Sequence, residues 1–487
     1  MARTDRDTVH FLLNGEAVSL TAPPPTLTLL NWLRQRRALT GTKEGCAEGD
    51  CGACTVVLAS WRDGAVHYRA VNACIVFIAT LDARAVITVE HLSQFGSLHP
   101  VQQTLVEQHA SQCGFCTPGI VMSLFARSQN GDESPAVDTL AGNLCRCTGY
   151  GPILAADDVV DREFARAMFE PQHKHLVDTL PGFDRDDHIG YTAKSGAFFA
   201  PAVPERLAEV LAEHPSATVL AGGTDVGLWV TKQQRTLETV VSTARLAELG
   251  GVSRNAGWLE IGAACSYRDA LPALADHHPR LGTLVRRIGS TQIRNTGTVV
   301  GNIANGSPIG DMPPALLALG ASVVLQSTEG TRELALDEFF IDYGKQAIAP
   351  GEFVRAVQVP PLGRDAHFSS HKISKRFEQD ISAVSFAGYV VCNAHGVVVD
   401  IRLAYGGLAG IPKRARQAES ALLGAPFTET ALHEGALDAL SADFSPLGDW
   451  RASRAYRERV ARNLLIKFVR EVATGNVVDL WPAADSV

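Results

Sequence analysis

Hydrophobic and polar residues alternate near the start of the chain in two short runs, residues 8–13 and 17–20. Such alternation is typical of strands that bury one face, and the Asn14-Gly15 pair between the runs is a strong signal for a hairpin turn. The pattern that follows predicts a helix and two more strands, which would complete a small mixed sheet, at residues 29–36, 55–58 and 86–89.

The next stretch has the spacing of helices. A proline at the first turn marks two predicted helices, at residues 100–109 and 118–127. A third helix is expected to begin at Pro135 or Val137.

A polar segment at about 166–195 contains His, Asp, Gly and Pro with little periodicity, which predicts a linker. The pattern beyond it predicts helices at 204–212, 314–319, 415–423 and 456–472, and strands at 217–220, 383–391 and 397–404.

The composition is that of a globular protein, with 46% hydrophobic and 20% charged residues. A chain of 487 residues usually divides into about two to four domains. The formal net charge of −8 argues against a nucleic-acid or anionic membrane partner. The N-terminal residues include no apolar signal segment, and no apolar run approaches the length of a spanning helix, so we expect a cytoplasmic protein. Its ten cysteines are then better explained as metal ligands than as disulfides.

The first cysteine set has the spacing of a plant-type [2Fe–2S] cluster: Cys46, Cys51 and Cys54 form C-x4-C-x2-C, and Cys74 follows. Four thiolates must converge on two irons, and the small residues of GCAEGDCGACTV let the backbone wrap around a cluster. A structural zinc site is the alternative, but zinc usually takes pairs of C-x2-C knuckles.

The second set combines C-x2-C with a distant C-x-C, formed by Cys113, Cys116, Cys145 and Cys147. These pairs would stand at the ends of antiparallel helices and close around a cluster. Taken alone, the second set also fits zinc. Cys265 stands apart from both sets, as does Cys392, and both are expected to be ordinary small core residues.

Two segments have the character of phosphate-binding loops. AGGTDVG, residues 221–227, places a glycine pair after a predicted strand, where the backbone can approach a diphosphate. Residues 288–321 are rich in Gly, Asn, Ser and Asp and predict a long ordered loop that leads into a helix. Neither is a G-x-G-x-x-G fingerprint, so a Rossmann domain is not indicated.

On these motifs the chain resembles the molybdenum hydroxylases, the group of xanthine dehydrogenase and aldehyde oxidase. GCAEGDCGACTV, QCGFCTPG and NLCRCTGY are that family's two cluster signatures in its order, with Ala47 and Asp50 where many members have glycine. The resemblance implies a multidomain α+β fold with five parts: a β-grasp plant-type ferredoxin domain at 1–92, a helical [2Fe–2S] domain at 93–165, the linker at 166–195, a vanillyl-alcohol-oxidase-type FAD-binding domain at 196–372 and a small α+β C-terminal flavoprotein domain at 373–487.

The same resemblance implies the roles of individual residues. The two cysteine sets would bind the two [2Fe–2S] clusters, and Gln112 would lie beside the pterin of a partner's molybdenum cofactor. The expected FAD-binding residues are Val219, Leu220, Ala221, Gly222, Gly223, Thr224, Asp225, Val226, Ile288, Thr298, Gly301, Asn302, Asp311, Val354 and Lys372.

By this likeness the chain is an electron-transfer subunit without catalytic residues of its own. Electrons would come from molybdenum on a separate large subunit, because a molybdenum module needs several hundred more residues, and would pass through the clusters to FAD and then NAD. The order of the modules favours the small subunit of xanthine dehydrogenase. The equivalent subunit of an aldehyde or N-heterocycle dehydrogenase and a redox sensor without turnover remain open.

Overall fold

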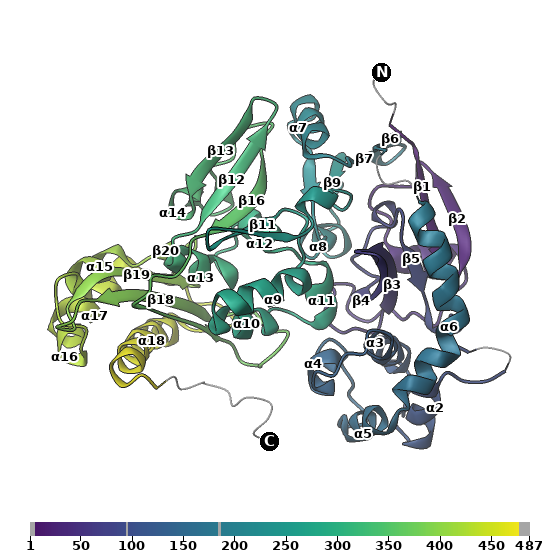
Figure 1. The fold of residues 1–487 in the computed structure, drawn as a ribbon, viewed down its shortest axis with the longest axis horizontal. Helices are drawn as coiled ribbons and strands as arrows, with labels where there is room; N and C mark the ends of the chain where they lie inside the picture. Colours follow the sequence, from purple (N-terminus) through teal and green to yellow (C-terminus); the bar gives the residue numbers. More distant parts are fainter. Residues whose placement is uncertain (1–4, 94–95, 184–186, 477–487) are drawn as a thin grey trace. The chain divides into compact units, whose positions relative to one another are not determined.

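The computed structural model describes residues 5–93, 96–183 and 187–476 and is drawn as a ribbon in Figure 1. The chain forms two compact units. The first unit comprises residues 1–247 and 289–297, and the second comprises residues 248–288 and 298–487. Among the described residues, no helix has both the length and the apolar composition needed to cross a membrane.

A five-stranded mixed sheet begins the first unit, with its strands in the order β2-β1-β5-β3-β4. The predicted hairpin is present, because β1 (Thr8–Leu13) pairs antiparallel with β2 (Glu16–Thr21). The predicted helix is also present as α1 (Leu29–Arg36), and its Trp32 packs edge-on against Phe11, with ring centroids 5.5 Å apart. The remaining strands are β3 (Thr55–Arg62), β4 (Ala65–Asn72) and β5 (Ala85–Ile87). Strand β4 was not expected from the sequence.

Helices follow this sheet, as the sequence predicts. Phe125 of α3 lies in a buried cluster with Tyr68 of β4 and Phe169, and the rings of Phe125 and Phe169 are 4.8 Å apart. The helices are α2 (Pro100–Glu107), α3 (Thr117–Gln129), α4 (Ala136–Leu140), α5 (Gly151–Val159) and α6 (Arg162–Thr179).

Helix α6 corrects the expectation of an irregular linker, because it occupies residues 162–179. Asp161 caps the helix by accepting a hydrogen bond from the Phe164 N–H. Ala165, Phe169 and Leu176 are buried on one side of it, at the spacing of a helical stripe. Only three of the apolar residues in this helix are buried, and polar residues separate them, so the periodic signal is weak, which explains the error.

A second, four-stranded sheet completes the first unit, with the order β6-β7-β9-β8. Strands β7 and β8 both pair parallel with β9, and β6 pairs antiparallel with β7. Its elements are β6 (Ile189–Ala193), β7 (Gly196–Ala200), α7 (Pro204–Glu213), β8 (Thr218–Leu220), α8 (Val226–Thr231) and β9 (Thr239–Ser242).

The second unit contains two larger sheets. In one sheet the strand order is β10-β11-β16-β12-β13. Its strands are β10 (Val252–Asn255), β11 (Trp258–Gly262), β12 (Ser322–Ser327), β13 (Gly330–Ala335) and β16 (Phe353–Val359). The helices in this part of the chain are α9 (Tyr267–His277), α10 (Pro279–Arg286) and α14 (Leu336–Phe339). A short hairpin is formed by β14 (Phe340–Asp342) and β15 (Lys345–Gln346).

The other sheet of the second unit is an antiparallel meander, β17-β18-β19-β20. The predicted strands and helices of this region are confirmed, and Tyr405 and Phe468 belong to its core. The elements are β17 (Ala366–Ile373), β18 (Val384–Cys392), β19 (Val398–Gly406), β20 (Lys413–Arg414), α15 (Arg416–Leu422), α16 (Glu429–Ala431), α17 (Leu437–Asp443) and α18 (Arg454–Thr474).

The glycine-rich segment 288–321 is more regular than the predicted loop. It contains two short helices, α11 (Thr291–Thr296) and α12 (Val299–Asn305), before α13 (Met312–Leu319). Ser290 and Thr298 explain the difference, because each side chain accepts a hydrogen bond from the backbone N–H three residues later and so caps its helix.

Candidate redox centres

The four cysteines of the first set converge in the loop before β3 and at the end of β4. The Sγ of Cys46 accepts hydrogen bonds from the backbone N–H groups of Asp50, at 3.4 Å, and Cys51, at 3.3 Å. The thiols of Cys51 and Cys74 also form hydrogen bonds with Cys46, and these hydrogen bonds hold the pKa of Cys46 far below its usual value. Bonds to Cys46 and Cys54 raise the pKa of Cys74, so the four sulfurs form one group.

Two glycines let the backbone pack closely around this group. A Cβ on Gly45 would lie 2.7 Å from the Sγ of Cys51. Gly52 has a φ of +70°, and a Cβ there would lie 1.9 Å from the carbonyl oxygen of Gly142. N–H groups aimed at sulfur and a close-fitting loop are the features that an iron–sulfur cluster requires, so the residues present fit one.

The second set lies in two loops between helices, with Cys113 and Cys116 between α2 and α3 and with Cys145 and Cys147 between α4 and α5, and of the four only Cys116 stands at a helix end, as N-cap of α3. The Sγ atoms of Cys113 and Cys147 are 3.6 Å apart, and both residues are exposed. Burial and a hydrogen bond with Cys145 raise the pKa of Cys116 to about 12, which places these two thiols together as well. Helix α3 begins directly after Cys116, and Gln112, beside Cys113, is exposed.

The first expected flavin segment forms a strand, a tight turn and a helix. Strand β8 ends at Leu220, and Gly223 takes a φ of +73° before α8 begins. A Cβ on Gly222 would lie 2.0 Å from the carbonyl oxygen of Thr296, at the end of α11. Gly222 is therefore required for packing of backbone against backbone, in addition to any approach of a phosphate.

The expected flavin residues of the second unit include a buried ion pair. Lys372 Nζ lies 2.6 Å from Asp311 Oδ2, and the side chain of Lys372 is 2% exposed. Ser382 Oγ donates to the other oxygen of Asp311 at 2.6 Å. Asp311, expected to bond a ribityl or ribose hydroxyl, therefore already holds two partners, and a carboxylate retains lone pairs for a further donor.

The remaining expected flavin residues stand on several elements of the second unit. Thr298 caps α12 through a 2.9 Å hydrogen bond from the Gly301 N–H. Ile288 and Val354 are buried, and Val354 pairs with Leu325 in the sheet of β12 and β16. The structure thus brings Asp311 together with Lys372 and Thr298 together with Gly301, whereas residues 219–226 belong to the first unit.

Four family models match successive parts of the chain. Their descriptions are "2Fe-2S iron-sulfur cluster binding domain" for residues 11–79, "[2Fe-2S] binding domain" for 88–157, "FAD binding domain in molybdopterin dehydrogenase" for 193–362 and "CO dehydrogenase flavoprotein C-terminal domain" for 369–472. The chain belongs to the molybdenum hydroxylase family. It carries the two iron–sulfur domains and the flavin region of that family, so the matches favour iron–sulfur clusters over zinc at both cysteine sets.

Relatives in the family include xanthine dehydrogenases. The xanthine dehydrogenase of Emericella nidulans is 32% identical over 96% of this chain and 39% of its own length. The xanthine dehydrogenase/oxidase of Mus musculus is 31% identical over 84% of this chain and 35% of its own. The chain thus spans about two fifths or less of the length of these relatives.

Solved structures resemble part of the chain. A chain of the carbon monoxide dehydrogenase from Hydrogenophaga pseudoflava is 26% identical, with a TM-score of 0.54, and the match covers 59% of this chain and 100% of that one. Quinoline 2-oxidoreductase from Pseudomonas putida 86 shares the fold at 23% identity and a TM-score of 0.53, over 58% of this chain and 99% of that one.

One departure from the family signature has a structural consequence. Ala47, where many members of the molybdenum hydroxylase family have glycine, takes a φ of +55°. A left-handed conformation costs a non-glycine residue roughly 1–2 kcal/mol. The cysteine loop bears this strain without losing the hydrogen bonds to Cys46.

Arg287, which holds the backbone at Lys372 in place, was not expected from the sequence. Arg287 is buried at 5% exposure and donates to the carbonyl oxygen of Lys372 at 2.6 Å and to Ser374 Oγ at 3.1 Å. Burial lowers the pKa of Arg287 from its usual value. An arginine in a helical pattern normally faces solvent, so the sequence offers no signal for this role.

Proposed function

We propose that this chain is the electron-transfer part of a xanthine dehydrogenase, which oxidises hypoxanthine and xanthine to urate with NAD as the acceptor. The observation that carries the proposal is the match to a named xanthine dehydrogenase over 96% of the chain, through both iron–sulfur domains and the flavin region. The eight cysteines Cys46, Cys51, Cys54, Cys74, Cys113, Cys116, Cys145 and Cys147 are proposed as the cluster ligands.

When bound, two one-electron clusters and a two-electron flavin convert electron pairs from substrate oxidation into a hydride for NAD. The chain's own residues hold and shield these groups. The N–H groups of Asp50 and Cys51 stabilise the negative sulfur of Cys46. The turn at Gly222 and Gly223 offers backbone to a diphosphate, and the buried pair of Asp311 and Lys372 offers side chains to a flavin.

We propose a separate large subunit as the holder of the molybdenum cofactor and as the electron donor. The exposed position of Cys113 and Cys147, with Gln112 beside them, suits a cluster that receives electrons across an interface. The carbon monoxide dehydrogenase chain offers a precedent, since a polypeptide of that family corresponds to only 59% of this one. The proposed route runs from the partner to the second cysteine set, then to the first set, then to FAD.

We also propose that the protein works in the cytoplasm. Eight cysteines that serve as thiolate ligands are best preserved in a reducing compartment. Recovery of the iron-loaded protein from another cell fraction would contradict this location.

A second candidate is the equivalent part of a dehydrogenase for aldehydes or N-heterocycles. The sequence relatives are xanthine dehydrogenases, but a structural neighbour is a carbon monoxide dehydrogenase, so the substrate need not be a purine. The substrate pocket of the partner would separate the two functions. A redox sensor without turnover is a third candidate, and failure of NADH to bleach the bound flavin would favour it.

The test divides the reaction between the subunits. The purified chain should pass electrons from NADH to a dye, and it should oxidise xanthine only after the large subunit is added. Cys116→Ser should block transfer from xanthine to NAD and spare NADH-to-dye activity. Cys392→Ser is the matched control, because Cys392 belongs to β18, outside both cysteine sets. Xanthine oxidation by the chain alone would show that the proposal misplaces the catalytic centre.

A further inference from the structure

Helix α8 joins the expected flavin turn to the first cysteine loop. The helix begins at Val226, directly after the turn, and is capped at its end by Lys232. Gly227 packs so closely on Ile75 that a Cβ would lie 2.8 Å from the Cβ of Ile75, the residue after Cys74. Both segments belong to the first unit, so the end of α8 has a defined position against the cysteines.

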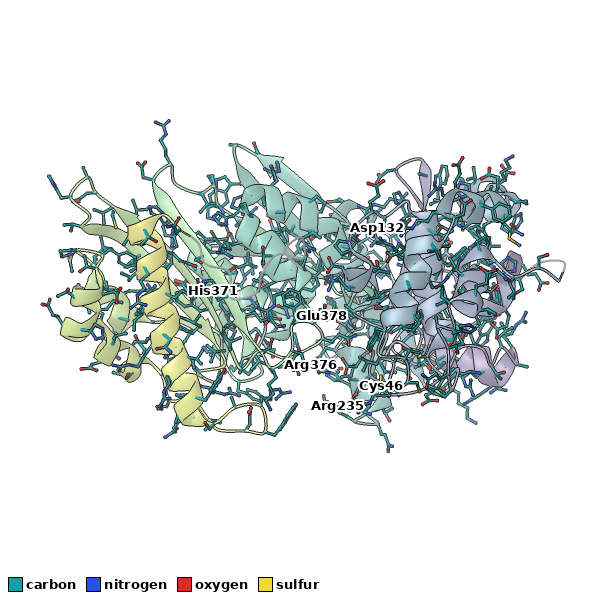
Figure 2. The ribbon with its side chains drawn as sticks, turned by 90° about the horizontal axis from the view of Figure 1, so that it is seen from below. Cys46, Asp132, Arg235, His371, Arg376 and Glu378 are labelled. Carbon is teal, nitrogen blue, oxygen red and sulfur yellow. The ribbon has the colours of Figure 1, made fainter. Side chains whose placement is uncertain are left out.

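Lys232 places a positive charge on the cysteine loop. Its Nζ donates to the carbonyl oxygen of Cys46 at 3.0 Å and lies 3.5 Å from Glu48 Oε2. Figure 2 labels Cys46 and, just beyond α8, Arg235, whose guanidinium lies over the ring of Trp229. Glu48 stands within the loop between Cys46 and Cys51 and donates its backbone N–H to the Cys46 thiol. One cation therefore contacts the backbone of Cys46, and one anion belongs to the loop that wraps its sulfur.

Charges at this place act on a redox centre in opposite directions. Reduction adds one negative charge to a cluster, so a nearby cation stabilises the reduced form and raises the reduction potential, whereas an anion lowers it. The side chains of Lys232 and Glu48 are 45% and 38% exposed, so salt will weaken both effects.

We propose that Lys232 and Glu48 are opposed tuning charges that set the reduction potential of the cluster held by Cys46, Cys51, Cys54 and Cys74. The proposal rests on that assignment of ligands. Lys232 favours the acceptance of an electron by this cluster, and Glu48 favours its release. Because Lys232 ends the helix that begins at the flavin turn, the position of the cation depends on the same segment that is proposed to hold FAD.

The test is a redox titration of the purified, iron-loaded chain, followed by low-temperature paramagnetic resonance, which reads each cluster by its own signal. Lys232→Gln should lower the midpoint potential of the first cluster, and Glu48→Gln should raise it. The double variant should return close to the wild-type value, and Lys232→Arg should match the wild type. The second cluster, which lies on other loops, should keep its potential in every variant.

Lys174→Gln is the matched control, since Lys174 is exposed on α6 and pairs with Glu170. It removes the same charge and should leave both potentials unchanged. The shift caused by Lys232→Gln should shrink in about 1 M salt, where the screening length is about 3 Å. Unchanged first-cluster potentials in both single variants would overturn the tuning role. Survival of both signals in Cys46→Ser would instead overturn the assignment of ligands, so the two failures are distinguishable.

Discussion

Gln292 donates a hydrogen bond from its side-chain amide to Asn143 Oδ1 at 3.0 Å, and no part of Gln292 is exposed. The same amide lies 3.2 Å from Ser123 Oγ and 3.3 Å from Thr55 Oγ1. Thr55 belongs to the first iron–sulfur domain, and Ser123 and Asn143 belong to the second. A helix from the flavin region is thereby fixed to both, which explains why residues 289–297 join the first unit.

Replacement of Gln292 by leucine should destabilise the first unit. Leucine has a similar size but no donor, and a buried partner left without its hydrogen bond costs about 1–3 kcal/mol. Urea unfolding, followed by the visible absorbance of the clusters, should show a lower free energy of unfolding by about that amount. Gln103→Leu, on the exposed side of α2, should change it by less than about 0.5 kcal/mol. An equal loss in both variants would contradict the role assigned to Gln292.

Gly222→Ala should weaken the binding of FAD. The added Cβ would meet the carbonyl oxygen of Thr296 at 2.0 Å, so the turn must move away from α11 and lose its shape. Flavin content after gel filtration and quenching of flavin fluorescence would report the loss, with iron content unchanged. Gly182→Ala has nothing within 4 Å of its added Cβ and should bind FAD like the wild type. Full flavin content in Gly222→Ala would show that the turn does not contact FAD.

Cys113→Ser should remove one paramagnetic signal of the reduced protein and spare the other. Cys113 contacts Cys147, at a sulfur–sulfur distance of 3.6 Å, and the first set forms its own group around Cys46. Iron should fall from about four to about two atoms per chain, as expected for two clusters of two irons. Loss of both signals, or stoichiometric zinc in the wild type, would contradict separate iron–sulfur sites.

Local signals in the sequence were sufficient to predict the structure where one motif determines one element. The Asn14-Gly15 turn predicted the first hairpin, and Pro204 predicted the start of α7. The cysteine spacings predicted both iron–sulfur domains, because ligand geometry restricts the backbone on each side of a thiolate.

Elements that depend on distant contacts were not predictable in the same way. Helix α6 is buried through Phe169 against Phe125, a partner outside its own segment. The burial of Lys372 follows from its pairing with Asp311, which is 61 residues earlier in the chain. Neither contact has a counterpart in periodicity or composition, so the polar character of residues 166–195 predicted a linker instead.

His99 makes the stability of the first unit depend on pH. Its Nδ1 accepts a hydrogen bond from the Val101 N–H at 3.3 Å, and its Nε2 lies 3.1 Å from the carbonyl oxygen of Ala165. His99 is 1% exposed, and burial lowers its pKa to about 4, against the smaller opposing effect of the Ala165 carbonyl. The folded protein therefore holds the neutral imidazole, protonated on Nε2.

Acid should weaken the fold through this residue. Below the ordinary histidine pKa of about 6.5, His99 binds a proton in the unfolded chain but stays neutral in the folded chain. The free energy of unfolding therefore falls by up to about 3 kcal/mol between pH 6.5 and pH 4. His99→Asn keeps an acceptor for the helix start but cannot titrate, so its free energy of unfolding should depend less steeply on pH in this range. Urea unfolding at several pH values, with iron content checked in each sample, would measure both slopes. His109→Asn, at an exposed position just beyond the same helix, should keep the wild-type slope, and an unchanged slope in His99→Asn would show that His99 is not the titrating group.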